Sequence, residues 1–131
     1  MFALRHPNII GLYAWYRVEG TISQVGAVIE LAAGGDLRHY YNQQDYDFFK
    51  ALKIIAGVAK GMAYMHSMPA PVIHRDLKSG NVLIMEDGVS AKIGDCGESR
   101  RLDLNNTMTQ TGTPLWAAVG VRRGELMFLF T

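Results

Sequence analysis

The chain has little of what marks a secreted or membrane-inserted protein. Its 131 residues include one cysteine, which excludes an internal disulfide and fits a reducing compartment. No apolar stretch approaches the roughly 20 residues that a membrane helix needs. Residues 1–7 lack the charged lead, apolar run and small-residue cleavage site of a signal peptide. We therefore expect a cytoplasmic protein with no membrane partner.

The chain also has no excess of positive or negative charge. Thirteen lysines and arginines stand against 12 aspartates and glutamates, which gives a net charge of +1. A nucleic-acid-binding domain usually carries a basic excess, so we expect no nucleic-acid partner. The sequence is 49% hydrophobic and 10% aromatic, which fits a globular fold rather than a disordered segment. The length fits one domain, and no internal repeat is visible.

Hydrophobic patterns predict two β-hairpins. In each case two segments rich in β-branched or apolar side chains flank a turn signal that contains glycine. The first hairpin is expected at 9–16 and 25–31, and the second at 82–85 and 89–93. Residues 98–107 are polar and irregular, so no regular structure is expected there.

Two helices are predicted between these hairpins. Asp36 follows a pair of glycines and can cap a short helix. A longer helix is expected over 48–66, with Asp45 or Asp47 as its N-cap.

The longer helix has an apolar stripe that is expected to face the core. Gly57 and Gly61 lie within it, and each costs a helix about 1 kcal/mol relative to alanine. Close packing of a neighbouring segment is the expected reason for them. The residues of the stripe recur at spacings of three and four: Phe48, Leu52, Ile55, Ala59, Met62 and Met65.

The stretch His74-Arg75-Asp76-Leu77-Lys78-Ser79-Gly80-Asn81 carries the strongest chemical signal. An aspartate can accept a hydroxyl proton, a lysine can neutralise a phosphate oxygen, and an asparagine amide can ligate magnesium. Those are the side chains that phosphoryl transfer needs. The stretch resembles the catalytic loop of protein kinases, H-R-D-L-x-x-x-N, in its serine/threonine form. We therefore expect Asp76, Lys78 and Asn81 to be catalytic, and His74 to be a packing residue.

Two further motifs follow in the order that this family requires. Asp95-Cys96-Gly97 comes 14 residues after Asn81, where kinases carry Asp-Phe-Gly. The resemblance implies that Asp95 and Asn81 are the magnesium ligands. Gly112-Thr113-Pro114-Leu115-Trp116 begins 17 residues after Asp95 and resembles the end of an activation segment. Relatives of these motifs occur in the tyrosine-kinase-like group, to which we assign the chain.

An upstream strand resembles the kinase hinge, Ala27-Val28-Ile29-Glu30-Leu31. The resemblance places Ile29 at the gatekeeper position. It implies that the backbone of Glu30 and Ala32 binds the adenine of ATP and that Asp36 reaches the ribose. It also implies that Leu83 supports the adenine ring from below. The implied cofactors are ATP and magnesium.

Two positions raise separate questions. Cys96 replaces a phenylalanine, and we interpret it as a small buried hydrophobic side chain; a redox-sensing thiol is the alternative. Arg75 is expected to meet a phosphorylated activation loop. The candidate phosphosites in that loop are Thr107, Thr109 and Thr111.

The fold class implied is α+β, as one partial protein kinase domain over 1–131. The expected parts are two strands of the small lobe, helices αD and αE, the catalytic loop and the activation segment. The resemblance covers about 4–116, and the tail at 117–131 departs from the family pattern. No glycine-rich loop, phosphate-binding strand lysine or αC glutamate is recognisable.

The predicted function is that of a serine/threonine protein kinase that phosphorylates protein hydroxyls. Because those phosphate-binding motifs are missing, we expect this truncated chain to be inactive alone. The alternative is a catalytically inactive fragment, or pseudokinase-like module, that binds proteins. The protein substrate and oligomeric state do not follow from the sequence.

Overall fold

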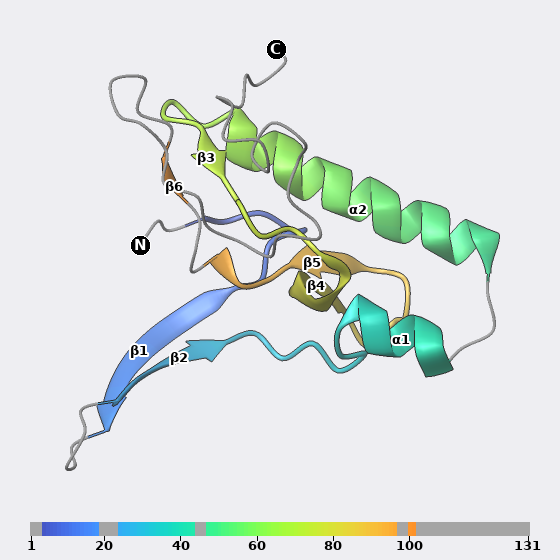
Figure 1. Ribbon diagram of the computed structural model, residues 1–131, viewed down its shortest axis with the longest axis horizontal. Coiled ribbons are helices and arrows are strands. Elements are labelled where there is room, and N and C mark those ends of the chain that lie inside the picture. The colour runs from blue at the N-terminus through green and yellow to red at the C-terminus, as the bar shows by residue number, and fades with distance from the viewer. Residues whose placement is uncertain (1–3, 19–23, 44–46, 97–99, 102–131) are drawn as a thin grey trace, which may run out of the picture.

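The computed structural model describes residues 4–18, 24–43, 47–96 and 100–101. Strands and helices occur in separate runs along the chain, and the named strands pair antiparallel, so the predicted α+β class is confirmed (Figure 1). In chain order they are β1 (Leu12–Val18), β2 (Gln24–Ile29), α1 (Leu37–Gln43), α2 (Phe48–His66), β3 (Val72–Ile73), the single 3-10 turn η1 (Ser79–Asn81), β4 (Val82–Ile84), β5 (Ala91–Ile93) and β6 (Arg100–Arg101).

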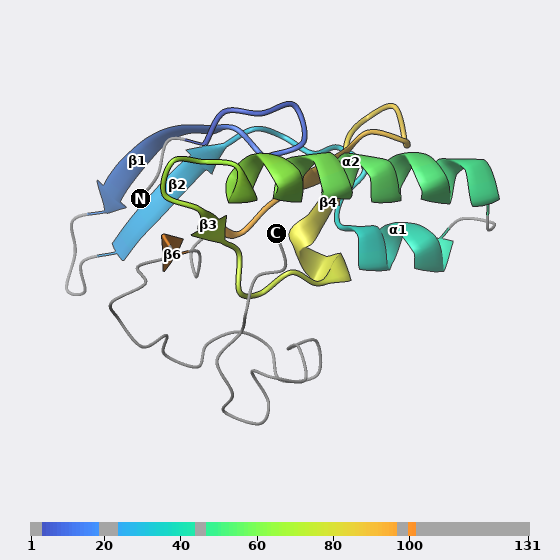
Figure 2. The same cartoon turned by 90° about the horizontal axis from the view of Figure 1, so that it is seen from above.

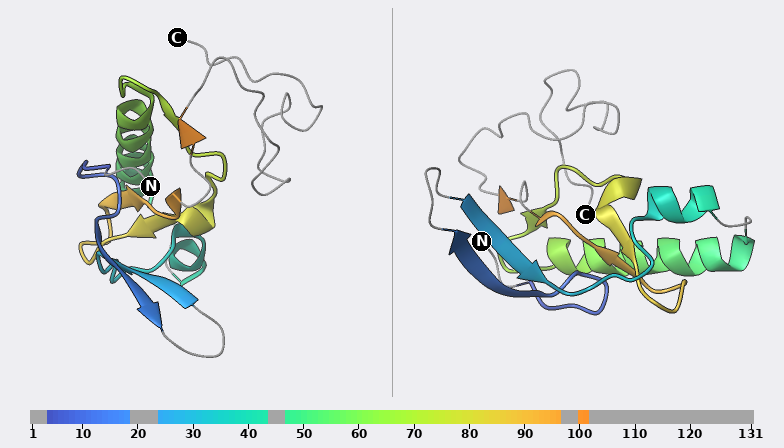
Figure 3. Two further views of the ribbon diagram at one scale, coloured as in Figure 1. Left: turned by 90° about the vertical axis from the view of Figure 1, so that its left-hand side faces the viewer. Right: turned by 90° about the horizontal axis from the view of Figure 1, so that it is seen from below.

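Strands β1 and β2 form the first predicted hairpin. They pair antiparallel, with Trp15 opposite Ala27 and an irregularity in register between Leu12 and Ala14. The first strand begins later than expected because Ile9 instead bridges to β5. The hairpin extends away from the helices, with β4 and β5 lying between it and α2 (Figures 1 and 3).

Helices α1 and α2 begin where the sequence provides capping carboxylates. Asp36 Oδ1 accepts a hydrogen bond from the backbone N–H of His39 at 3.0 Å, at the start of α1. Asp47 Oδ1 accepts from the N–H groups of Phe49 and Lys50 at the start of α2. Both predicted helices are thus confirmed, and they lie side by side (Figure 2).

The glycines of α2 allow the close packing that was predicted. A Cβ atom on Gly61 would lie 2.7 Å from Asn8 O and 2.8 Å from Ile93 Cδ1. A Cβ atom on Gly57 would lie 2.9 Å from Asn8 Nδ2. Real Cβ atoms do not approach so closely, so these two positions let the segment before β1 and strand β5 contact the helix.

The predicted core stripe of α2 is wrong. Only Met65 of that stripe is buried and Met62 is half-buried, whereas the other four residues are exposed. The stripe that faces inward has equally good helical spacing. It was not predicted because two of its residues are glycines, which were not counted as apolar positions. It consists of Ile54, Gly57, Gly61 and Met65.

The second predicted hairpin is confirmed but shorter than expected. Strands β4 and β5 pair antiparallel with Leu83 opposite Lys92. In the connecting turn, Gly88 adopts a φ of 68° and Asp87 Oδ1 accepts from the N–H groups of Val89 and Ser90. The short pair β3–β6, with Val72 opposite Arg101, was not predicted. Two-residue strands are too short to show an alternating pattern.

The core of the described residues consists of two clusters on α2. One contains Ile54, Val82, Ile84 and Ala91, with side chains of α1 packed against it. The other contains Ile9, Met65 and Val72. Strands β4 and β5 are therefore held against the helix, and the loops at their ends are fixed by this packing.

Candidate active site

The loop between β3 and η1 is anchored by a buried histidine. His74 is 1% exposed, and its Nε2 lies 3.0 Å from the carbonyl oxygen of Gly94. Its Nδ1 accepts from the backbone N–H of Asp76 at 3.4 Å. The predicted packing role of His74 thus includes tying the loop to the residue that precedes Asp95.

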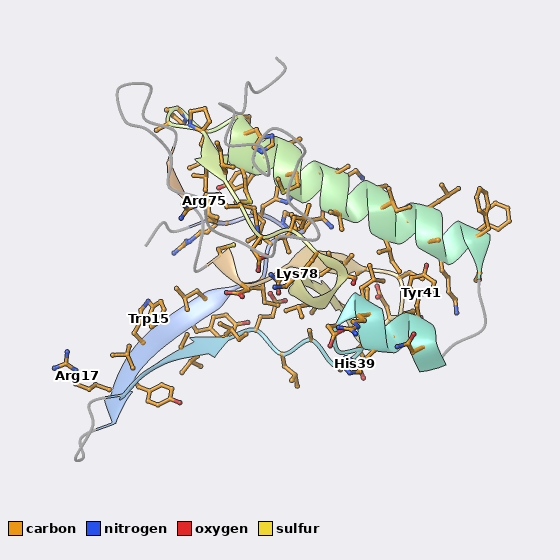
Figure 4. All side chains as sticks on the ribbon, in the orientation of Figure 1. Trp15, Arg17, His39, Tyr41, Arg75 and Lys78 are labelled. Atoms are coloured by element: carbon orange, nitrogen blue, oxygen red, sulfur yellow. The ribbon has the colours of Figure 1, made fainter. Side chains whose placement is uncertain are left out.

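Three predicted catalytic residues are brought together in this loop. Lys78 Nζ lies 2.7 Å from Asp76 Oδ2, so the two charges form an ion pair. The side-chain amide of Asn81 donates to Asp76 O at 2.8 Å and to Asp76 Oδ2 at 3.0 Å. Asp76 is only 9% exposed, and these donors compensate for the burial of its charge. Lys78 lies near the centre of the molecule, whereas Trp15 and Arg17 lie on the hairpin (Figure 4).

A cleft of about 940 Å³ lies between the hairpin and β4–β5. Its volume is within the usual range for small-molecule sites. The lining includes five residues that the sequence predicts for the nucleotide and metal: Ile29, Glu30, Leu83, Asn81 and Asp95. The other four predicted residues are not part of the lining: Ala32, Asp36, Asp76 and Lys78.

Asn81 connects the cleft to the catalytic loop. It lines the cleft and its amide donates to Asp76, so the aspartate lies next to a residue of the cleft wall. Both amide hydrogen bonds of Asn81 point to Asp76, which turns its amide oxygen the other way. A group bound in the cleft beside Asn81 would therefore lie close to Asp76.

Asn81 and Asp95 fit a magnesium ion chemically. Amide and carboxylate oxygens are the ligands that magnesium prefers, and both residues line one cleft. Asp95 has a φ of 48°, a left-handed conformation that is uncommon outside glycine. Within the described residues, no group of three or more histidine, cysteine, aspartate or glutamate side chains could hold a metal ion. The amide oxygen of Asn81 and the carboxylate of Asp95 would thus share the ion with substrate phosphates.

The carboxylate of Asp36 is already engaged at the start of α1. Its Oδ1 accepts from the His39 N–H, and its Oδ2 lies 2.5 Å from His39 Nδ1. The hydrogen bond from that N–H, followed by the one from the ring, lowers the pKa of Asp36. Asp36 also bridges to Leu83 of the cleft lining, so its backbone lies at the cleft edge while its carboxylate contacts His39.

Cys96 packs against the cluster of Ile9, Met65 and Val72. It is half-buried and also lines the cleft. This agrees with a small apolar side chain in the core, although its burial is incomplete.

The sequence did not reveal the roles of Lys92 and Gly11. Lys92 Nζ lies 2.6 Å from Glu30 Oε1, and the Gly11 N–H donates to Glu30 Oε2 at 3.0 Å. The Lys92 hydrogen bond, followed by the Gly11 N–H, lowers the pKa of Glu30. Glu30 and Lys92 are 62 positions apart, so no local pattern joins them. In the sequence, the only indication that Lys92 has a specific partner was its position between the apolar residues Ala91 and Ile93.

Several predicted features lie outside the described residues. These are the glycine after Cys96, the candidate phosphosites and the end of the activation segment: Gly97, Thr107, Thr109, Thr111 and Gly112-Thr113-Pro114-Leu115-Trp116. The proposed meeting of Arg75 with a phosphate therefore stays a prediction. Arg75 itself has a φ of 68° and follows the buried His74.

Comparison with known sequences decides the family. The model of the protein kinase domain matches residues 1–123. This chain belongs to the protein kinase family. A putative serine/threonine-protein kinase/receptor of Acanthamoeba polyphaga mimivirus is 36% identical over 125 residues, which cover 94% of this chain and 7% of the viral protein. Serine/threonine-protein kinase TNNI3K of Mus musculus is 43% identical over 101 residues, which cover 73% and 12% respectively.

The kinase relatives are much longer than this chain. A probable serine/threonine-protein kinase of Dictyostelium discoideum, roco6, is 38% identical over 137 residues that cover 95% of this chain and 6% of the relative. The matched regions of the relatives described here span between 6% and 12% of their length. The prediction of a partial serine/threonine-type kinase domain is confirmed. Members of this family generally use ATP and magnesium and act on proteins. Among the described helices, none combines the length and apolar character needed to cross a bilayer.

Proposed function

We propose that this kinase domain transfers the γ-phosphate of ATP to serine or threonine hydroxyls of a protein. The observation that carries the proposal is the cluster of Asp76 with Lys78 and Asn81, of which Asn81 lines the cleft. Phosphoryl transfer depends on positioning and charge neutralisation, and these three side chains supply both.

Each residue of the loop has a role in this proposal. Asp76 orients the substrate hydroxyl and accepts its proton as the oxygen bonds to the γ-phosphorus. The bond from that phosphorus to the β,γ-bridging oxygen breaks, and ADP leaves. Lys78 is close enough to Asp76 to neutralise the transferring phosphate. Asn81 and Asp95 would hold magnesium, which would neutralise charge on the phosphates.

The adenine end of the cleft is proposed to lie at the hinge. The backbone of Glu30 and Ala32 hydrogen-bonds the base, and the side chain of Leu83 packs beneath it. Glu30 and Leu83 both line the cleft, which supports this placement. The carboxylate of Asp36 already accepts from His39 on both oxygens, so it would reach the ribose through its remaining lone pairs.

For the 131 residues by themselves we propose nucleotide binding without phosphate transfer. The sequence contains no recognisable glycine-rich loop or strand lysine, so much of the positioning of the phosphates is missing.

Titration calorimetry of ATP into the purified chain, with and without magnesium, tests the site. We expect magnesium-dependent binding that Asp95→Asn weakens about tenfold through loss of a charged ligand. Asp87→Asn, in the exposed β4–β5 turn away from the cleft, is the matched control and should bind like the wild type. Binding that does not respond to magnesium or to Asp95→Asn would contradict the metal assignment.

A radiolabelled phosphate-transfer assay tests the inactivity. We expect no transfer to a protein substrate above the level of Asp76→Asn. Transfer by the wild type that Asp76→Asn abolishes would show that the chain is a working enzyme.

A protein-binding module is the second candidate. It is favoured by the exposed apolar face of α2, where Phe48 is 56%, Phe49 75% and Ile55 63% exposed. Contiguous exposed apolar surface usually marks a contact site. Absence of nucleotide binding together with association through this face would favour the module over the enzyme.

A further inference from the structure

The side chain of Glu30 is one of the links between the hairpin and the rest of the molecule. Glu30 follows β2, and its backbone N–H donates to Gly11 O at 2.8 Å. Its carboxylate reaches two other segments, because Oε2 accepts from Gly11 N and Oε1 from Lys92 Nζ. The side chains of Glu30 and Lys92 are 22% and 17% exposed, so the ion pair is largely shielded from water. Such a pair is stronger than an exposed one.

Lys92 is held rigidly at its own end. Its neighbours Ala91 and Ile93 are buried against α2, and the alternation of a strand therefore directs Lys92 to the opposite side, toward the hairpin. Ile93 N donates to Asn8 O, and Ile93 O accepts from Ile10 N, both at 2.9 Å. The lysine thus projects from a strand that is packed on one face and bonded at its edge.

The same pair crosses the predicted adenine site. Lys92 lies opposite Leu83 in the β4–β5 register, and Glu30 supplies the hinge backbone. All three residues line the cleft. The ion pair therefore links the hinge residue Glu30 directly to the strand opposite Leu83, whereas the backbone hydrogen bonds between Ile84 and the two glycines at 34–35 attach the chain only further on.

We propose that Lys92 and Glu30 are positioning residues that fix the hinge over Leu83 for adenine binding. This inference rests on the proposed nucleotide site. Lys92 acts through Glu30 and does not itself contact the base.

The test measures nucleotide affinity in Lys92→Met, Lys92→Arg and the exchanged pair Glu30→Lys with Lys92→Glu. We expect Lys92→Met to weaken binding of magnesium-ATP about tenfold and of adenosine by the same factor, because the base end is displaced. Lys92→Arg should recover most of the affinity, whereas the exchanged pair restores the ion pair but removes the acceptor of the Gly11 N–H, and should recover only part of it. The magnesium concentration for half-maximal binding should stay unchanged, since Asn81 and Asp95 are untouched. Lys60→Met, an exposed lysine on α2, is the matched control and should change neither affinity.

A merely structural role gives a different result. Lys92→Met would then lower the unfolding temperature while nucleotide affinity, measured well below that temperature, stayed at the wild-type value. That outcome would overturn the proposal.

The experiments distinguish failure of the proposed nucleotide site from failure of the proposed positioning role of Glu30 and Lys92. If the wild type binds neither ATP nor adenosine, the nucleotide site is wrong for this chain. Hydrogen exchange of the amides of residues 24–32 then decides the role of the pair. Faster exchange in Lys92→Met, reversed in Lys92→Arg, supports the positioning role, and unchanged exchange overturns it.

Discussion

Glu30 directly follows β2, and its carboxylate links stability to pH. The Lys92 ammonium and the Gly11 N–H lower its pKa in the folded chain. A carboxyl group with a lowered folded pKa stabilises the fold above its unfolded pKa of about 4.3, and loses that effect as the pH falls through the folded pKa.

Glu30→Gln should therefore destabilise the chain at pH 7 by about 1 kcal/mol. The difference from the wild type should shrink as the pH falls from about 5 toward 3. Urea unfolding of both proteins across this range measures it. A difference that stays constant with pH would show that packing, not charge, accounts for the loss.

The residue scale also shows what the sequence can predict of a site. Asp76, Lys78 and Asn81 lie within six consecutive residues, so their proximity follows from one short loop. Lys92 reaches Glu30 across 62 positions, and only the packing of β5 on α2 brings them together. Local chemistry is readable from sequence, whereas a pair made by tertiary packing is not.

At the scale of elements, the inner face of α2 is set by its glycines. Gly61→Ala places a Cβ atom 2.7 Å from the Asn8 carbonyl oxygen, which belongs to backbone and cannot rotate away. Alanine gains about 1 kcal/mol in helix propensity, but overpacking typically costs about 1–3 kcal/mol.

We expect Gly61→Ala to be destabilising by about 1 kcal/mol, as measured by urea unfolding. Gly80→Ala is the control, because a Cβ atom there would meet nothing within 4 Å. An unfolding midpoint for Gly61→Ala at or above the wild-type value would show that the segment before β1 moves aside easily.

Helix α2 also shows that helical periodicity predicts the span of a helix better than it predicts which face is buried. Its span over 48–66 was predictable because helical spacing and a capping aspartate agree. Its buried face was not, because two apolar stripes have nearly equal spacing. The choice between them depends on Asn8 and Ile93, which contact the glycines from elsewhere in the chain.

At the scale of the whole molecule, apolar surface remains on the outer face of α2. Leu52 is 46% and Ile55 63% exposed, and both lie on the stripe first predicted to be core. Exposed apolar surface of this kind promotes association.

We expect the chain to associate in solution and the double variant Leu52→Glu, Ile55→Glu to be monomeric with little change in stability. Light scattering gives the mass, and urea unfolding checks the fold. The variant Lys50→Glu, Lys53→Glu changes charge on exposed residues of the same helix without removing apolar surface, and should associate like the wild type. Association that persists in the apolar-to-glutamate variant would place the contact elsewhere, for example on the hairpin.

The hydrogen bond from Asn8 Nδ2 to the Ala91 carbonyl oxygen joins positions 83 apart in the chain. Contacts of such separation form only after a long loop has closed, which slows folding. On a ribosome, the segment before β1 emerges early and can meet α2, but the partner of its Asn8 side chain follows only when β5 has been synthesised. Ile54 of α2, which packs against β4 and β5, stays open to solvent for that interval. Until β5, the last core strand among the described residues, has been synthesised, the nascent chain is thus exposed to aggregation.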